Sequence, residues 1–408
     1  MLRLPIIMVI SLLALPLVAS DRAALQQLID AAAAGSTLVP EPGTYDGPIT
    51  IEKAITLDGQ GRVTIDAGGK GSVVYLDSDG VVLRNLRLTN SGDSHNTIDA
   101  GVQVRGNFNV IKDNVIDDCL FGIDLQQSEH NIVRRNRISS KAVELGLRGD
   151  AVRLWYSFGN KITDNIIRDS RDTVVWYSKD NTISGNDAQG GRYALHFMYS
   201  QYNKVEDNRY RHNSVGIFLM YSDSVEIRRN TIASAVGATG VGIGFKETSD
   251  VTIENNKILY NATGIYLDVS PYQPDTSNRI HDNLLAFNNI GIRFLNGWHG
   301  NEFKRNRFKG NLTEVVVSDG GTANNNAWDG NYWDHYQGFD RNKDGVGDTP
   351  FEHYSYADRI WIDVPSAQFF KGSPMLEVLD FLERLAPFSP PELVLRDKAP
   401  LVEAGETL

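Results

Sequence analysis

The sequence predicts an all-β fold, a right-handed parallel β-helix with about 22–23 residues per turn. Two observations lead to this prediction. Residues 193–200 and 215–222 are near copies of one short sequence and lie 22 residues apart. Within each copy apolar residues alternate with other residues, which is the pattern of a strand with one buried face. An antiparallel sandwich would instead show hairpin turns and no fixed period.

A second regularity is an apolar residue followed three positions later by Asn. Most Asn-to-Asn steps are 21 to 23 residues, whereas steps of 29, 26 and 27 residues indicate insertions near 140–149, 233–240 and 270–277. Asn tolerates left-handed backbone, and its amide can bond to the turns above and below. We therefore expect a structural ladder at one corner rather than a binding site. Its members are Asn114, Asn136, Asn165, Asn186, Asn208, Asn230, Asn256, Asn283 and Asn306.

Columns of equivalent residues can be assigned to the core or the surface, because side chains of a strand alternate between its two faces. We expect about three short strands per turn. Two columns are apolar throughout and predict the core. They are Ile123, Val152, Leu195, Ile217, Ile265 and Ile292, and Leu125, Leu154, Phe197, Leu219, Leu267 and Phe294.

Both ends of such a solenoid need a cover, because an open end exposes unpaired strands and core. An amphipathic helix is expected before the first turn, and an aromatic stretch at 328–334 is expected to open the C-terminal cap. The predicted division is a signal peptide at 1–20, a capping helix at 21–36, the β-helix at 37–320, a cap with an acidic loop at 321–370, and a helix and tail at 371–408.

The N-terminus predicts export. Arg3 supplies a positive start, and the 15 residues 4–18 are apolar apart from Ser11. This run is short for a membrane span, which needs about 20 residues. An uncleaved anchor is the alternative, and we expect the mature protein outside the cytoplasm.

Composition excludes several classes of partner and site. The net charge is −11, and Lys and Arg are scattered between acidic residues, so no nucleic acid is expected as partner. Cys119 is the one cysteine, which excludes an internal disulfide and a metal site made of cysteines alone.

Two outward columns are polar at their ends and apolar in their middle, although they should face water. Four stacked Trp and Met side chains make a patch of the size at which a partner is suspected. The candidate partner-binding residues here are Trp155, Trp176, Met198, Phe218 and Met220. The columns read Gln126, Trp155, Trp176, Met198, Met220, Lys246 and Asp268, and Asp124, Arg153, Val174, His196, Phe218, Gly244, Tyr266 and Arg293.

The same columns hold candidate copper ligands. Met198 and Met220 should lie on adjacent turns, about 5 Å apart, with His196 on the same face. Thioethers suit Cu(I), and imidazole suits copper generally. Three interpretations stay open: the C-terminal segment covers the patch, a partner docks there without metal, or Cu(I) binds directly.

An acidic loop is a candidate calcium site. Oxygen-bearing side chains alternate around Gly345, which permits a sharp turn, as in calcium loops. Phe351 occupies the twelfth position, where such loops usually have a bidentate Glu, so a solvated acidic turn is the alternative. The candidate ligands are Asp340, Asn342, Asp344, the Val346 carbonyl and Asp348.

A carbohydrate site is a further possibility, since two carboxylates with an Arg suit cleavage or epimerisation of a polysaccharide. The available residues are dispersed over distant turns, and no compact acid pair with a His emerges. They are Asp99, Asp124, Asp150, Asp268, Arg153 and Arg293.

Several motifs together resemble the NosD family of periplasmic β-helix proteins in nitrous oxide reductase maturation. They are GDAVRLWYS at 149–157, HFMYS at 196–200, WDGNYWD at 328–334, GDTP at 347–350 and LDFLERLAPF at 379–388. The resemblance runs from the signal peptide to about Arg396. The β-helix turns alone are generic, but this combination is specific.

The resemblance implies a non-enzymatic periplasmic protein, peripheral to the inner membrane through its partners. These partners are the membrane and ATPase subunits of an ABC transporter, a copper-delivering lipoprotein and nitrous oxide reductase, whose copper–sulfur centre is assembled. Residues 374–396, with Leu379 and Leu382, could then dock on the transporter. The alternatives are a secreted polysaccharide lyase or uronate epimerase, and a carbohydrate-binding solenoid.

Overall fold

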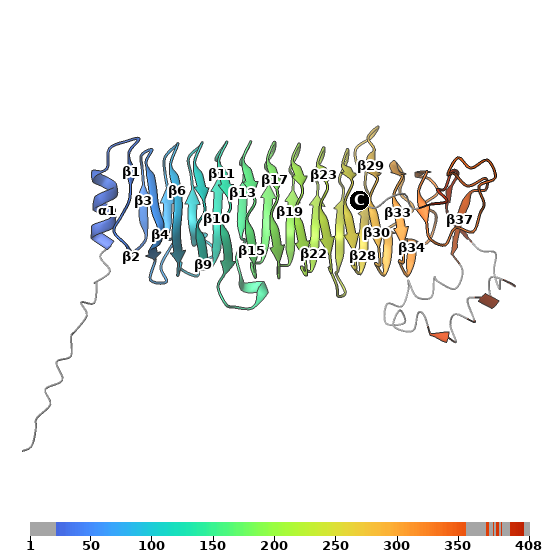
Figure 1. Ribbon diagram of the computed structural model, residues 1–408, viewed down its shortest axis with the longest axis horizontal. Coiled ribbons are helices and arrows are strands. Elements are labelled where there is room, and N and C mark those ends of the chain that lie inside the picture. Colours follow the sequence, from blue (N-terminus) through green and yellow to red (C-terminus); the bar gives the residue numbers. More distant parts are fainter. Residues whose placement is uncertain are drawn as a thin grey trace, which may run out of the picture.

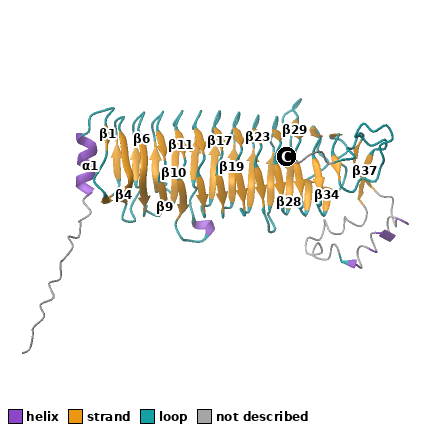
Figure 2. Cartoon of the chain, viewed as in Figure 1, coloured by secondary structure: helices purple, strands orange, loops and turns teal. Residues whose placement is uncertain are grey.

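The computed structural model describes residues 22–355 and 392–403, together with a few positions between 373 and 385. These residues form an elongated parallel β-solenoid of about 13 turns (Figure 1), which confirms the predicted fold class. Helix α1 (Arg22–Ala31) lies across one end of the stack of strands (Figure 2). The predicted signal peptide and most of the predicted C-terminal helix fall outside the described residues.

One face of the solenoid is a sheet of 12 parallel strands, in which each turn contributes one strand. The strands are β3 (Ile49–Ile51), β5 (Val74–Leu76), β7 (Ala100–Val104), β10 (Phe121–Gln126), β13 (Val152–Trp155), β16 (Asp172–Trp176), β19 (Tyr193–Met198), β22 (Val215–Met220), β25 (Val241–Lys246), β28 (Thr263–Asp268), β31 (Ile290–Phe294) and β34 (Thr313–Val317).

The other faces form one continuous sheet of 24 strands, mostly two per turn, so that three strands per turn are observed as predicted. The strands are β1 (Thr37–Leu38), β2 (Gly43–Asp46), β4 (Thr56–Asp66), β6 (Val82–Thr89), β8 (Val110–Lys112), β9 (Val115–Cys119), β11 (Ile132–Arg134), β12 (Arg137–Ser140), β14 (Lys161–Thr163), β15 (Ile166–Arg168), β17 (Thr182–Ser184), β18 (Asp187–Gln189), β20 (Lys204–Glu206), β21 (Arg209–Arg211), β23 (Glu226–Arg228), β24 (Thr231–Ala233), β26 (Thr252–Glu254), β27 (Lys257–Leu259), β29 (Asn278–His281), β30 (Leu284–Ala286), β32 (Asn301–Lys304), β33 (Arg307–Lys309), β35 (Ala327–Asp329) and β36 (Tyr332–Trp333).

Both predicted core columns are buried. Leu195 lies opposite Ile217, and Phe197 opposite Leu219, and all four side chains are fully buried. The predicted insertions leave the solenoid as loops, and the first contains the short helix η1 (Leu145–Leu147). Insertions therefore occur at corners, where they do not disturb the register of the strands.

The predicted Asn ladder is present, and its members are buried. The side-chain oxygen of Asn208 accepts a hydrogen bond from the backbone N–H of Asn186, 2.9 Å away. The Asn208 amide in turn donates to Asn230 and to the Ile183 carbonyl, each at 2.9 Å. The left-handed backbone was expected at the Asn itself. It lies instead at the residue before each Asn, such as Asp207 with φ of 57°.

Two further ladders occupy other corners and were not predicted. Each repeats the same amide-to-turn hydrogen bonds between successive turns. The first contains Asn109, Asn131, Asn160, Asn181 and Asn203, and the second Asn261, Asn288 and Asn311.

The aromatic stretch 328–334 differs from its expected role. It does not open the cap, because β35 and β36 pair with β32 and β33 and so extend the sheet beyond residue 320. The ring of Trp328 stacks on Phe303 at 4.1 Å, and that of Trp333 on Phe308 at 4.2 Å. Trp328 and Asn331 repeat the apolar–Asn spacing of the earlier turns.

The two ends are covered differently. At the N-terminal end, α1 buries Leu25 and Ile29 against the first turns, as expected of a capping helix. At the other end, β37 (Phe351–Ser355) and β38 (Glu392–Asp397) form an antiparallel pair. Phe351 stacks on Trp333, and the Asp397 carboxylate accepts a hydrogen bond from the Asn331 amide at 2.9 Å.

Replacing a ladder residue tests this account. Asn208→Ala should lower the free energy of unfolding by roughly 2–4 kcal/mol, because it removes the side-chain partners of the buried Asn186 N–H and Ile183 carbonyl in the preceding turn. Chemical denaturation followed by circular dichroism measures this loss. Asn325→Ala, at an exposed position, is the matched control and should change stability by less than about 0.5 kcal/mol. Equal effects of the two substitutions would contradict the structural role of the ladder.

Candidate functional site

The predicted outward column is formed as expected. Trp155, Trp176, Met198 and Met220 lie in register on the adjacent strands β13, β16, β19 and β22, and we call them the aromatic–methionine stripe. All four side chains are half-buried. The rings of Trp155 and Trp176 meet edge-on, with centroids 5.8 Å apart. Gln126 precedes the stripe and Lys246 follows it, so the apolar part is limited to four turns.

His196 lies beside the stripe in a dry environment. Its side chain is only 5% exposed, its ring stacks on Tyr193 at 4.8 Å, and it meets Trp176 edge-on at 5.8 Å. Neither ring nitrogen has a hydrogen-bond partner among the described residues, and the same is true of the Trp176 indole nitrogen. Burial lowers the pKa of His196 to about 4, so the imidazole is neutral at pH 7.

These residues fit copper in donor type. A neutral imidazole with unused nitrogens is the form that binds metal, and burying it without a partner costs stability. Met198 and Met220 are opposite each other across the β19–β22 pair, and His196 is on the same face of β19. Two thioethers and an imidazole are the soft and borderline donors that favour Cu(I).

A column of tyrosines runs beside the stripe and was not predicted as a functional feature. Tyr156, Tyr177, Tyr199 and Tyr221, which we call the tyrosine stack, have successive ring centroids 4.9, 5.2 and 4.9 Å apart. Each has a left-handed backbone, with φ between 48° and 51°, which turns the ring outward. Tyr156 and Tyr199 are 44% and 48% exposed. The sequence signal was the recurrence of Tyr between each Trp or Met and the following Ser.

Two cations flank this aromatic surface. The Arg153 guanidinium lies 4.7 Å from the centre of the Trp155 ring, and the Lys246 ammonium 5.9 Å from the centre of the Tyr221 ring. Both distances allow cation–π attraction. The surface therefore combines aromatic faces, sulfur and positive charge at its edges.

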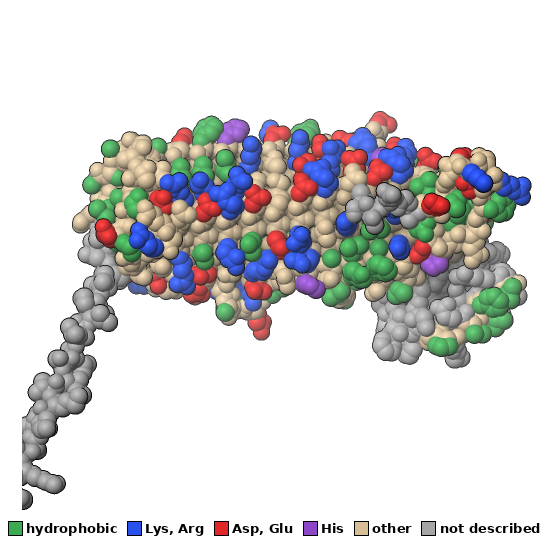
Figure 3. Space-filling view, in the orientation of Figure 1, with side chains coloured by type: hydrophobic (Ala, Val, Ile, Leu, Met, Phe, Trp, Pro, Cys, Tyr) green, Lys and Arg blue, Asp and Glu red, His purple; other side chains and the backbone are tan. Residues whose placement is uncertain are grey.

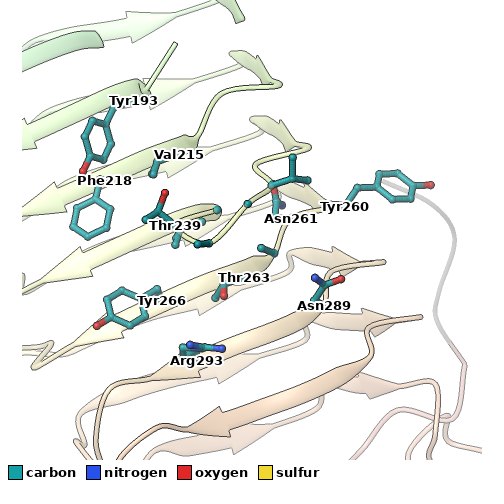
Figure 4. Close-up of a pocket in the computed structure, with 16 residues that line it drawn as sticks. Tyr193, Val215, Phe218, Thr239, Tyr260, Asn261, Thr263, Tyr266, Asn289 and Arg293 are labelled. Carbon is teal, nitrogen blue, oxygen red and sulfur yellow. The ribbon is translucent and has the colours of Figure 1, made fainter. Parts of the chain in front are cut away.

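A groove of about 860 Å³ along the same sheet is lined by Tyr193, whose ring stacks on His196, and by Phe218 (Figure 4). Phe218, Tyr266 and Arg293 from the sheet line the groove, and so does the loop 236–240 before β25. Burial lowers the pKa of Arg293, and its Nε atom has no hydrogen-bond partner within the described residues. The groove thus offers aromatic rings and a half-buried cation.

The acids considered for carbohydrate chemistry are engaged in ion pairs between turns. Fully buried Asp124 lies 2.9 Å from Arg105 and 2.7 Å from Arg153. Asp150 pairs with Arg171 at 2.9 Å, and burial raises its pKa to about 6. Interspersed positive and negative side chains also cover the face seen in Figure 3.

The remaining two acids have other surroundings. Asp99 holds its own loop through Ser94 and Thr97. Asp268 ends the stripe column, and burial raises its pKa. The structure therefore does not gather these four acids into a site that could supply a catalytic pair of carboxylates.

The acidic loop is folded around its own carboxylates. Asp340 accepts hydrogen bonds from the backbone N–H groups of Lys343 and Gly345, and Asp344 from that of Val346. Asn342 donates to Asp344, and Asp348 accepts from the Arg341 backbone. The calcium site stays a prediction.

Of the two leucines predicted to dock on the transporter, Leu379 falls outside the described residues. Leu382 is 51% exposed.

Known proteins resemble this chain in sequence. A family model described as "Periplasmic copper-binding protein (NosD)" matches residues 138–338. A protein of Pseudomonas aeruginosa named "Probable ABC transporter binding protein NosD" is 28% identical over 400 residues, which cover 85% of this chain and 83% of that protein. A protein of the same name from Stutzerimonas stutzeri is 26% identical over 379 residues, covering 85% and 82%. The chain belongs to the NosD family.

Solved structures resemble this NosD-family chain in fold alone. The A-module of the mannuronan C-5 epimerase AlgE6 of Azotobacter vinelandii has a TM-score of 0.59 at 18% identity, covering 76% of this chain and 95% of that one. The alginate lyase AlyF-OU02 has a TM-score of 0.52 at 16% identity, covering 73% and 88%. These likenesses support the solenoid and carry no activity over to it.

The family description places NosD proteins in the periplasm and calls them copper-binding. Within the described part of the chain, no helix is long and apolar enough to cross a membrane.

The low pKa of His196 makes stability depend on pH. In the unfolded chain its pKa is about 6.5, so the unfolded state binds more protons between about pH 4 and 6.5. The native state should therefore lose up to roughly 3 kcal/mol from this residue as the pH falls through that window. Comparing the free energy of unfolding of the wild type and His196→Phe at several pH values measures the loss.

The wild type must be compared with the variant, because Asp150 changes the free energy of unfolding with pH in the direction opposite to His196. Its raised pKa of about 6 contributes stability that is present at low pH and is lost as the pH rises through 6. Both proteins contain Asp150, so its contribution cancels in the difference. A constant difference between the two proteins from pH 7 to pH 4 would show that His196 is not buried in its neutral form.

Proposed function

We propose that this NosD-family chain is the periplasmic docking subunit of an ABC transporter complex that serves nitrous oxide reductase maturation. In this proposal the chain itself catalyses no reaction. Its role is to hold a copper-delivering lipoprotein and the reductase apoprotein on one face of the solenoid while the copper–sulfur centre is assembled. The family match and the names of the two relatives support the transporter part of the proposal.

One observation carries the choice of face: the buried His196 imidazole has no hydrogen bond to any described residue, and it lies next to stacked Trp and Met side chains. The solenoid core does not need these outward groups, and each is an unfavourable choice for a surface that stays in water. A partner that covers the stripe would remove Trp176 and Met198 from water. It could also supply the missing hydrogen-bond partners.

Copper is cargo in this proposal and not a resident cofactor. Met198 and Met220 would supply thioether ligands and His196 a neutral imidazole, and such a set stabilises the reduced ion during transfer. The half-buried stripe limits access of water to the donors. Lys246 at one end would attract an acidic patch on the partner, whereas the charge of Arg153 at the other end is neutralised by Asp124.

Two other interactions are part of the proposal. Asp340, Asn342, Asp344, Asp348 and the Val346 carbonyl would hold a structural Ca²⁺ near the C-terminal end. Residues 374–396 would dock on the outer surface of the membrane subunits, which in turn pair with the ATPase subunits. Deleting these residues would then release the protein from the membrane complex.

Carbohydrate binding is the second candidate function. The groove beside Phe218, with Tyr266 and the half-buried Arg293, offers the aromatic faces and the positive charge that a sugar acid would need. Alginate oligosaccharides are suitable probes. Binding that depends on Arg293, or any turnover of alginate, would favour this class over the docking subunit.

Removing sulfur from the stripe tests the copper part. The double variant Met198→Leu/Met220→Leu keeps the apolar volume and should weaken Cu(I) binding by at least about 100-fold. Competition with bicinchoninate under anaerobic conditions measures the affinity. Phe218→Leu, which alters a neighbouring apolar side chain without removing a donor, should bind Cu(I) as the wild type does. Unchanged affinity in the double variant would exclude this site.

Truncating the aromatic surface tests docking. Trp155→Ala/Trp176→Ala should weaken binding of the soluble domain of the copper-delivering lipoprotein by at least about tenfold, because buried Trp residues often dominate interfaces. Biolayer interferometry measures the dissociation constant. Tyr199→Ala should have a smaller effect in the same direction.

The matched control for docking is Tyr260→Ala. Tyr260 is 55% exposed and stacks on Phe287 at 5.2 Å, so it is another exposed stacked Tyr, but it lies outside the stripe. It should leave binding unchanged. Docking that survives Trp155→Ala/Trp176→Ala would contradict the proposed face. If Trp155→Ala/Trp176→Ala abolishes docking but Met198→Leu/Met220→Leu does not, the face binds its partner without copper.

A further inference from the structure

Glu314 breaks a column of small residues at the C-terminal end of the 12-stranded sheet. In the register of β22, β25, β28, β31 and β34 it follows Gly216, Gly242, Gly264 and Gly291. A Cβ atom at Gly291 would lie 2.6 Å from the Glu314 backbone oxygen, so earlier turns have no room for a long side chain. Glu314 stands on the last strand of the sheet, and its side chain is only 5% exposed.

Part of this carboxylate has a structural role. Asn311 is the last member of its ladder, and its amide donates a hydrogen bond of 3.0 Å to Oε2 of Glu314. The carboxylate thus takes the place that the next Asn has in the earlier turns. Asp334 is held in a similar way, since its Oδ2 atom accepts a hydrogen bond from the Gly310 backbone. Each carboxylate is therefore oriented through one of its two oxygens.

The remaining oxygen of Glu314 and that of Asp334 both lie close to His335. Oε1 of Glu314 and Oδ1 of Asp334 are buried and accept no hydrogen bond within the described residues. Nδ1 of His335 lies 3.4 Å from the first and 3.1 Å from the second. One imidazole nitrogen carries at most one proton, so it does not satisfy both oxygens. Bringing two charged carboxylates together away from water is costly unless a shared proton or a positive charge lies between them.

We propose that Glu314, Asp334 and His335 bind a divalent transition-metal ion, with Zn²⁺ the favoured ion. Their ligand atoms all lie within 4.8 Å of one another, in the described part of the chain. Two carboxylate oxygens and one imidazole leave a fourth position for water or a partner's ligand, as in open zinc sites. Asn311 and the Gly310 N–H orient the ligands, as outer hydrogen bonds do in known metal sites.

The donor set distinguishes this site from the stripe. It contains no sulfur, so it does not favour Cu(I), and its nitrogen makes it less suited to Ca²⁺ or Mg²⁺ than an all-oxygen site. The imidazole is 67% exposed, which gives an ion a route of entry. A bound ion would join β34 to the segment after β36 and so fasten the last turns together. The proposal is independent of the copper and docking functions.

The test uses the full mature chain without a histidine tag, stripped of metal with chelator and dialysed into buffer with excess Ca²⁺. Isothermal titration with Zn²⁺ should show one site, and thermal unfolding should shift to higher temperature on addition of Zn²⁺. His335→Ala should lower the affinity by at least about 100-fold and remove the thermal shift. Because His335 is exposed, this variant should fold as the wild type does. Glu314→Gln, which keeps an acceptor for Asn311, should have the same effect on Zn²⁺.

The control is His299→Ala, another exposed histidine that lies outside the cluster. It should bind Zn²⁺ as the wild type does. Titration of the Co²⁺-loaded chain should show visible absorption that His335→Ala removes. Absence of stoichiometric Zn²⁺ binding, or binding that His335→Ala leaves unchanged, would overturn the proposal. A parallel titration with Cu(I) should be unaffected by His335→Ala, which separates this site from the stripe.

Discussion

The buried Asn amides are the interaction on which the rest of this structure depends. Each amide, such as that of Asn208, bonds to the backbone of the turn before it and to the Asn side chain of the turn after it, so one turn has a single register against the next. A shift of one residue in a strand would exchange its buried and exposed faces. The ladder therefore fixes which side chains face outward, and it places Met198 opposite Met220 and His196 beside Phe218.

Because the register is fixed, the inward residues of each strand serve folding and the outward residues are available for function. Inward positions such as Leu195 and Phe197 must fill the core, whereas the outward positions between them can vary at little cost to stability. Since folding does not dictate the outward residues, their chemistry indicates what the surface binds. Trp176, Met198 and His196, which has no hydrogen-bond partner in the described part of the chain, face away from the core. An aromatic and sulfur-bearing surface of this kind is best explained by something that binds it.

The sequence was sufficient for the period, the core columns and the stripe, because all three follow from spacing alone. It was insufficient where the outcome depends on packing between turns. The burial of His196 arises from Tyr193 and Trp176, and the tyrosine stack arises from left-handed backbone at Tyr177 and its equivalents. The end of the solenoid was misplaced for another reason: the unusual composition of 328–334 concealed the same apolar–Asn spacing found in earlier turns. The cluster at Glu314 joins two separate turns, and no local motif marks it.

The candidate copper and zinc sites differ because of where they lie in the repeat. In the middle of the solenoid most corner amides, such as that of Asn208, are already paired with the next turn, and new chemistry enters through outward side chains such as Met198 and Met220. At the last turn no further strand follows, so a ladder must end on something else. Carboxylates serve this purpose at Glu314 and Asp397, and each ends a column of Asn residues. Asp397 shares its oxygen with Trp333, whereas Glu314 keeps one oxygen turned toward Asp334 and His335. The end of a ladder is therefore a natural place for hard and borderline ligands, and the outward column is the place for soft ones.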